Sequence, residues 1–250
     1  MVKPSASLTT ENFNSTGVEM GNEFNGFSKE LVTFYEELAQ NNNRDWFQKN
    51  KQRYRDVALH PMCDFISDFA DHLEEIAPRY IADPRPNGGS VFRIHRDVRF
   101  AKDKKPYKEH LACQFRHQAG KDAHAPGFYL HIDLEGIRYG GGVWLPSPPK
   151  LALIRQSIDE NPGKWRAIRN DPDILSEFGG VQGDGLKTAP KGYAKDHPDI
   201  EDLRRKTFFL MKRAPISAIH SRSLIDEVAD TYRKAIPFMK FLTNAVELPY

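Results

Sequence analysis

The spacing of apolar residues changes twice along this chain, and these changes constrain its fold more than any other feature. From about Ser28 to Ile76, apolar residues recur at the three- and four-residue spacing of amphipathic helices. From about Ser90 they alternate with polar residues, and helical spacing returns near Ser147. Helices, then strands, then helices predict an α+β fold, in which N-terminal and C-terminal helices flank a central, mostly antiparallel sheet.

The pattern predicts individual elements. Ser28 and Asn43 suit helix N-caps, and Pro61 suits the first turn of a third helix. Four strands are expected in a meander with connections too short for parallel pairing, at residues 92–100, 111–117, 127–134 and 137–144. After the sheet, helices are expected after Ser147 and after Pro162, followed by an irregular loop over 179–198. A short helix from about 200 and a strand at 208–210 come next. The last helix is expected over 223–236, where Pro237 ends or kinks it.

Composition fits a soluble globular protein, since 39% of the 250 residues are hydrophobic and 28% are charged. No apolar run approaches the roughly 20 residues of a membrane helix, and the first residues lack a secretory signal. Residues 1–26 are polar and predict a disordered tail, which leaves 27–250 as a single α+β domain. Two cysteines, Cys63 and Cys113, exclude a four-cysteine zinc site within one chain and are expected as reduced thiols in a cytoplasmic protein.

The densest cluster of charge lies between Arg93 and His110. The formal net charge of the chain is only +2, so any anion-binding site must come from such local clustering. Seven basic residues stand against Asp97, Asp103 and Glu109; they are Arg93, Arg96, Arg99, Lys102, Lys104, Lys105 and Lys108. Guanidinium groups suit phosphate or carboxylate, whereas ion pairs to the neighbouring carboxylates would make the same segment a solvated strand face.

Several motifs in this chain are similar to those of a known family. The central ones are Phe92-Arg93-Ile94, Arg96-Asp97-Val98-Arg99-Phe100, Asp103-Lys104 and Pro106-Tyr107-Lys108. Further ones are residues 42–47, Gly140-Gly141-Gly142 with Trp144-Leu145-Pro146, and residues 187–193. With these motifs the chain resembles, over about residues 27–243, the uncharacterised family catalogued as domain of unknown function 2461.

That family has no established activity, so the resemblance implies no reaction, ligand or cofactor. It implies that seven residues belong to the family's signature, which could serve folding as well as binding: Arg93, Arg96, Asp97, Arg99, Lys104, Tyr107 and Lys108. We take these seven as the candidate site for an anionic small molecule. The basic residues would receive the anion, with Arg99 favoured, Tyr107 would orient it, and Asp97 would hold an arginine or act as an acid or base.

Two other functions remain open. A metal-dependent enzyme could use His95, Asp97 and His131, because His-x-Asp occurs at 95–97 and again at 131–133, although the surrounding positive charge disfavours a cation. A nucleic-acid-binding module is the second, since basic residues near Tyr107 and Tyr129 resemble a stacking platform, but no recognised binding motif supports it. Glycines 140–142 could also let a ligand lie against the sheet.

Overall fold

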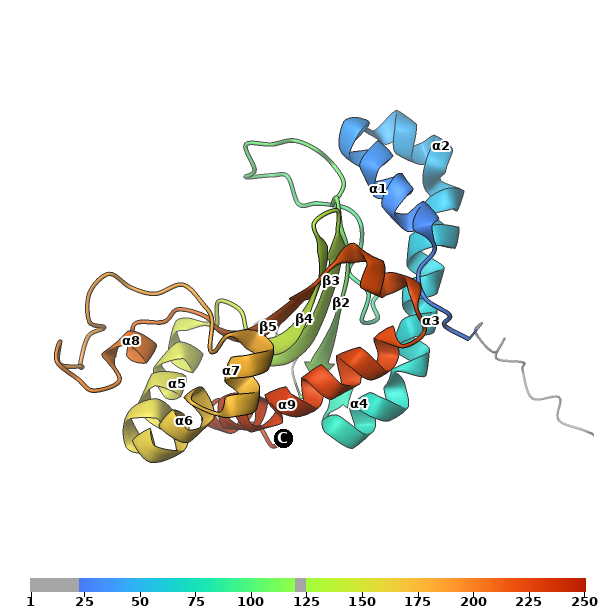
Figure 1. The fold of residues 1–250 in the computed structure, drawn as a ribbon. Helices are drawn as coiled ribbons and strands as arrows, with labels where there is room; N and C mark the ends of the chain where they lie inside the picture. The colour runs from blue at the N-terminus through green and yellow to red at the C-terminus, as the bar shows by residue number, and fades with distance from the viewer. Residues whose placement is uncertain (1–22, 120–124) are drawn as a thin grey trace, which may run out of the picture.

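The computed structural model describes residues 23–119 and 125–250, which build a five-stranded antiparallel sheet with helices from both ends of the chain (Figure 1). The strands lie side by side in chain order. Their bounds are β1 Tyr80–Ile81, β2 Leu111–His117, β3 Gly127–Asp133, β4 Gly136–Val143 and β5 Phe208–Ala214. The α+β fold with a central antiparallel sheet is therefore confirmed.

The N-terminal helices follow the predicted apolar stripes. They are α1 Lys29–Gln40, α2 Arg44–Tyr54, a π-helical turn Arg55–Leu59, α3 His60–Asp68 and α4 Ala70–Ile76. Asn43 caps α2 as predicted, because its side chain accepts a hydrogen bond from the backbone N–H of Trp46 at 3.0 Å. Of the expected tail, residues 1–22 lie outside the described residues, whereas Phe24 is 2% exposed and packs against Phe27 and Phe65.

The C-terminal half places one long helix across the sheet. Its helices are α5 Pro148–Glu160, α6 Pro162–Arg169, α7 Pro172–Phe178, α8 Ile200–Leu203, a 3-10 turn Ile216–His220 and α9 Leu224–Ala245. Helix α9 covers one face of the sheet (Figure 1), and the ring of its Tyr232 lies 4.6 Å from that of Phe128 on β3. Among the described residues no helix is long and apolar enough to cross a membrane.

The expected end of the last helix at Ile236 is wrong. Helix α9 continues through Pro237 to Ala245. A proline inside a helix costs about 3 kcal/mol. Beyond it, however, Phe238, Met239 and Leu242 are fully buried, and each contributes roughly 1.5–3 kcal/mol, so packing on the sheet outweighs the lost hydrogen bond.

The expected strand at residues 92–100 is also wrong, because this segment is a loop. An isolated bridge from Val91 to Cys113 precedes it, the backbone N–H of Phe92 donates to the carbonyl of Ala112 on β2 at 3.0 Å, and a second bridge joins His95 to Tyr107 within the loop itself. Side chains bind the loop to its own backbone, as Lys104 donates to the carbonyl of Val98 at 2.9 Å. The residues of this segment therefore do not divide into the two faces of a strand.

The uncovered face of the sheet carries the alternate residues of each strand. On β3, Phe128 and Leu130 are fully buried on the side of α9, whereas Tyr129, His131 and Asp133 are only partly buried on the other side. Cross-strand pairing extends this second side over the four longer strands. We call it the open face; it comprises Gln114, Tyr129, His131, Asp133, Arg138, Phe209, Met211 and Arg213.

Both edges of the sheet are restricted. Strand β1 has two residues. At the other edge, the backbone N–H of Gln182 donates to the carbonyl of Phe209 at 2.8 Å, and the N–H of Phe209 donates to the carbonyl of Gln182 at 3.1 Å. The Gln182 side chain adds a hydrogen bond to the carbonyl of Met211.

Candidate functional site

A cavity of about 630 Å³ lies on the open face. Side chains of β2, β3, β4 and β5 form its floor, and Phe92, Trp144 and Gln182 add to its wall. Its volume is in the range that holds small-molecule ligands.

Strand register orders the cavity from a cationic end to an apolar end. One row across the sheet consists of His131 paired with Arg138, and Arg138 paired with Arg213. The next row along the strands consists of Gln114, Tyr129, Gly140 and Met211, and the third includes Gly127, Gly142 and Phe209. A ligand along the strands would therefore meet positive charge at one end and apolar surface at the other.

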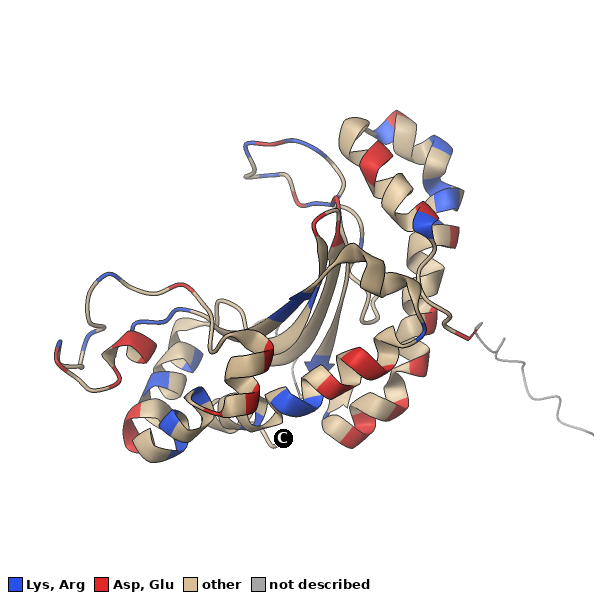
Figure 2. Ribbon diagram, in the orientation of Figure 1, with Lys and Arg blue, Asp and Glu red and all other residues tan. Residues whose placement is uncertain are grey.

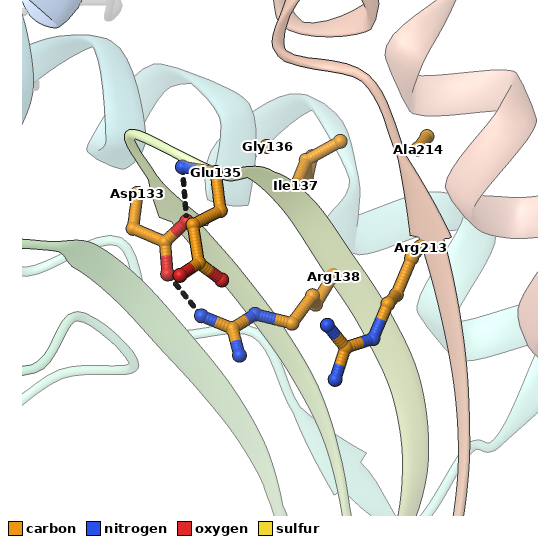
Figure 3. A pocket seen from close by; sticks show the side chains of 7 residues that line it. All are labelled: Asp133, Glu135, Gly136, Ile137, Arg138, Arg213 and Ala214. Carbon is orange, nitrogen blue, oxygen red and sulfur yellow. Dashed lines mark hydrogen bonds and ion pairs between the residues drawn. The ribbon is translucent and has the colours of Figure 1, made fainter.

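The cationic row contains two arginines that lie directly opposite each other. Figure 3 shows the guanidinium groups of Arg138 and Arg213 side by side, at the edge of a smaller pocket that Asp133 and Glu135 also line. Arg138 forms an ion pair with Asp133. Arg213 is exposed and has no ion pair with any residue that the structure describes. Like charges directly opposite each other on a sheet destabilise it.

Three side chains on β3 form a chain of hydrogen bonds beside the arginines. The hydroxyl of Tyr129 lies 2.9 Å from Nδ1 of His131, and Nε2 of His131 lies 2.9 Å from a carboxylate oxygen of Asp133. The ring of His110 stacks on His131 with 4.3 Å between centroids.

Burial keeps both imidazoles neutral near pH 7. It lowers the pKa of His131, although the hydrogen bond to Asp133 acts in the opposite direction, and Arg138 lowers the pKa further. Burial and the neighbouring His131 lower the pKa of His110 to about 4. Nε2 of His131 also lies 3.0 Å from a guanidinium nitrogen of Arg138, and it cannot donate to the carboxylate and accept from the guanidinium at once. In the tautomer that donates from Nε2 to Asp133, the lone pair of Nδ1 faces the Tyr129 hydroxyl.

The glycines of β4 allow a close approach of two strands and leave the cavity floor bare. A Cβ at Gly140 would lie 1.9 Å from the carbonyl oxygen of Leu210. Gly142 has φ +154°, and a Cβ there would lie 2.2 Å from the carbonyl oxygen of Phe208. These glycines therefore mark a close approach of β4 to β5; a ligand lying against them stays a prediction.

Most of the seven residues of the sequence-based candidate site already have partners within the loop. Arg96 binds Asp103 at 2.8 Å, and Arg99 binds Asp97 at 2.7 Å. These are the ion pairs of the alternative interpretation, and Figure 2 shows blue and red segments close together along this loop. Lys104 donates to a backbone carbonyl, as described above. Anion binding at this cluster stays a prediction.

Tyr107 holds the loop on the N-terminal helices. Its ring is 2% exposed and stacks on Phe47 at 4.1 Å. Its backbone N–H donates to the side chain of Asn42 and its carbonyl accepts from the same side chain, both at 3.1 Å. Lys108 connects the loop to the cavity, because its ammonium group lies 5.3 Å from the ring of Phe92, while Arg93 is exposed and its carbonyl accepts from Lys108.

The three residues of the metal hypothesis have separate surroundings. His95 lies beside Phe47 and Tyr107, Asp97 binds Arg99, and His131 belongs to the chain of hydrogen bonds on β3. Within residues 23–119 and 125–250, no three His, Cys, Asp or Glu side chains are placed to hold a metal ion.

Sequence reasoning missed Arg138, Arg213 and Gln114, and weighed His131 only as a metal ligand. A signal for Arg138 was present, because the Leu134-Glu135 turn pairs Asp133 with Gly136 and so sets His131 opposite Arg138. Arg213 lies on β5, which pairs with β4 but is far from it along the chain, so no local sequence pattern indicates that Arg213 lies opposite Arg138.

One comparison with known proteins identifies a family. The model of the conserved hypothetical protein family DUF2461 matches residues 30–241. No curated protein and no solved structure matches the chain. The family match covers most of the helices and all five strands described above. The chain therefore belongs to the conserved hypothetical protein family DUF2461.

Proposed function

We propose that this protein binds an amphipathic organic anion in the cavity of the open face. The phosphate or carboxylate of the ligand would lie at Arg138 and Arg213, and its apolar body would extend toward Phe209 and Trp144. The observation that carries this proposal is the charge of the row that contains His131, Arg138 and Arg213. The neighbouring Asp133 pairs with His131 and with Arg138, and Arg213 has no counter-ion among the described residues.

The charge of this row supports an anionic ligand. Each guanidinium group carries a planar set of N–H donors that matches the oxygens of a carboxylate or phosphate, and two such groups are adjacent here. A bound anion would remove the repulsion between Arg138 and Arg213, so binding and relief of strain would act in the same direction.

The far end of the cavity supports an apolar body on the ligand. The rings of Trp144 and Phe209 lie 5.6 Å apart, and Met211 lies in the row between Phe209 and the arginines. Phe92 forms part of the opposite wall, with its ring 6.0 Å from that of Tyr129. Aromatic and thioether side chains of this kind bind flat or aliphatic groups.

The basic loop then has a peripheral role. Its Lys108 lies over Phe92 at the cavity wall, and its remaining cations would attract an anion over a distance of about one Debye length, roughly 10 Å. Arg96 and Arg99 keep their own carboxylate partners in this arrangement.

A thermal-shift experiment tests the proposal. Benzoate and phenyl phosphate should raise the melting temperature of the wild-type protein, while neutral benzamide should not. The shift should disappear in Arg213→Gln. It should persist in the control Arg99→Gln, because Arg99 lies on the loop and pairs with Asp97. A shift that disappears in Arg99→Gln but persists in Arg213→Gln would move the site to the loop, and no shift in wild type would refute anion binding.

The state of the cysteines bears on where the ligand would be met. Cys63 and Cys113 are both free, and Cys113 is fully buried. Unpaired thiols are usual in reducing compartments. We therefore propose a cytoplasmic location, where anionic metabolites would be the available ligands.

A further inference from the structure

We propose that the cavity is an active site in which the Tyr129 hydroxyl attacks esters that carry an anionic group. His131 would act as the base, and Asp133 would position His131. The anionic group of the substrate rests on the proposed function, because it would bind at Arg138 and Arg213. The nucleophile and its base rest on separate observations.

The geometry is that of a nucleophile, a base and an orienting carboxylate in series. Tyr129, His131 and Asp133 occupy alternate positions of β3 and so point to one face, with 2.9 Å between each hydrogen-bonded pair. Such a series is the general arrangement of a hydroxyl nucleophile activated by histidine. Tyr129 and His131 line the cavity, whereas Asp133 lies behind His131.

The fold holds Tyr129 rigidly. Strand β3 is paired on both sides, with β2 and with β4. From the covered face, the hydroxyl of the fully buried Tyr232 donates to the backbone carbonyl of Tyr129 at 2.9 Å. These contacts fix the backbone from which the Tyr129 side chain projects, so less conformational entropy is lost when a substrate binds.

The protonation states suit this role. Burial raises the pKa of Tyr129 to about 12, so its phenol is neutral at rest and needs a base at the moment of attack. The lowered pKa of His131 favours its neutral form, and the tautomer that donates from Nε2 to Asp133 presents the lone pair of Nδ1 to that hydroxyl. The imidazolium that forms would be stabilised by the carboxylate of Asp133, 2.9 Å from Nε2.

Gln114 can supply the group that stabilises the carbonyl oxygen during attack. It lies directly across from Tyr129 on β2. Its Oε1 accepts a hydrogen bond from Arg116 at 3.3 Å, and its Nε2 lies beside Gly127, so the side chain would turn toward the Tyr129 hydroxyl when a substrate binds. Fixed N–H donors at a developing oxyanion lower the barrier of acyl transfer.

The chemical step balances with water as the second substrate. The oxygen of Tyr129 forms a bond to the acyl carbon, its proton moves to Nδ1 of His131, and the ester C–O bond breaks as that proton passes to the leaving alcohol. Water then attacks the acyl-tyrosine and gives a proton to His131. The bond between the acyl carbon and the Tyr129 oxygen breaks, and the proton returns to that oxygen. Protonation by His131 therefore assists the departure of the Tyr129 oxygen in this second half.

A covalent probe tests the proposal without knowledge of the natural substrate. The probe 4-(fluorosulfonyl)benzoate carries a carboxylate, an aromatic ring and an electrophilic sulfur atom. Tyr129 should attack that sulfur, the S–F bond should break with loss of fluoride, and the phenolic proton should pass to His131. Mass spectrometry should locate one sulfonyl group per chain at Tyr129.

Variants separate activation from mere exposure. Tyr129→Phe should abolish labelling, and His131→Gln should slow it at least tenfold. The matched control is Tyr139→Phe, because Tyr139 lies on the neighbouring strand but on the side covered by α9. Asp133→Asn should slow labelling and move the inflection of its pH profile to lower pH, since the imidazolium loses its carboxylate partner. This last readout distinguishes a positioning role from a structural one and does not need the His131 variant to fold.

The outcomes distinguish the two proposals. Two results would support the nucleophile and refute the anion site. One is labelling of Tyr129 that depends on His131 but not on Arg213, and the other is labelling of Tyr129 by the neutral phenylmethanesulfonyl fluoride at the same rate. Protection of the protein against heat by benzoate, without labelling of Tyr129 by the probe, supports the anion site and overturns the nucleophile. Labelling only at other residues, or an unchanged rate in Asp133→Asn across pH, also overturns it.

Discussion

Removing the charge of Arg213 should stabilise the protein in the absence of a ligand. Arg138 and Arg213 are directly opposite each other on β4 and β5, and cross-strand side chains of this kind begin about 5 Å apart. Two unit charges at that distance in water repel by roughly 0.8 kcal/mol. Asp133 offsets part of this repulsion through its ion pair with Arg138. We therefore expect Arg213→Gln to raise the free energy of unfolding by about 0.2–0.8 kcal/mol, and the melting temperature by roughly 0.5–3 °C.

Salt dependence provides the decisive measurement for this prediction. Urea unfolding of wild type and Arg213→Gln should be compared at about 10 mM and about 1 M salt, because the Debye length falls from roughly 30 Å to 3 Å between these conditions. The gain should be present at low salt and vanish at high salt. The control Arg99→Gln breaks an exposed ion pair with Asp97 and should lose stability or stay unchanged. A loss of stability in Arg213→Gln at low salt, or a gain that salt does not alter, would show that Arg213 has favourable contacts of its own and would remove the main support for the anion site.

Three further predictions concern stability. Gly140→Ala should lower the free energy of unfolding by about 1–3 kcal/mol, since its Cβ would lie 1.9 Å from a carbonyl oxygen of β5. Gly163→Ala, whose Cβ would have no atom within 4 Å, should raise the free energy of unfolding by up to about 1 kcal/mol. Urea unfolding that ranks the two variants in the opposite order would contradict this. Asn42→Ala removes both hydrogen bonds to the backbone of Tyr107 and should cost about 1–3 kcal/mol, and an unchanged melting temperature would disprove their contribution. The pKa of His110 is lowered from an ordinary 6.5 to about 4 in the folded protein. Between these pH values the unfolded chain binds a proton that the folded chain does not bind, so the free energy of unfolding should fall as the pH drops from 6.5 toward 4. His110→Gln should flatten that decline, and parallel pH profiles of stability for wild type and His110→Gln would rule out a contribution of His110.

The fold was predictable where two signals agreed, and not where one stood alone. Over 127–144, alternation and the turn signal of Glu135-Gly136 both predict a hairpin, and the structure contains one, with Leu134 and Glu135 in its turn. Over 92–100, alternation alone suggested a strand, but the structure has one isolated bridge there and Phe100 is 94% exposed. The loop satisfies its backbone through side chains such as Asn42 and Lys104, which a periodicity argument does not consider.

The candidate site was less predictable than the fold, for a physical reason. A dense run of charge in a sequence usually contains its own counter-ions, as Arg99 and Asp97 show, being two residues apart and ion-paired. Arg138 and Arg213 are separated by several helices and a long loop, and only the pairing of β4 with β5 brings them together. The absence of a nearby partner, which makes a charge available to a ligand, is a property of the folded chain.

The coverage of the sheet edges has a consequence for how this protein behaves at high concentration. A long unpaired edge strand is a template on which another chain can add a strand, and it is a common origin of aggregation. Here β1 is too short to serve, and the backbone of Gln182 occupies the N–H and carbonyl groups of Phe209 on β5. Deleting the segment around Gln182 would expose those groups beside the apolar Phe209 and Met211, and we expect the shortened chain to self-associate through β5.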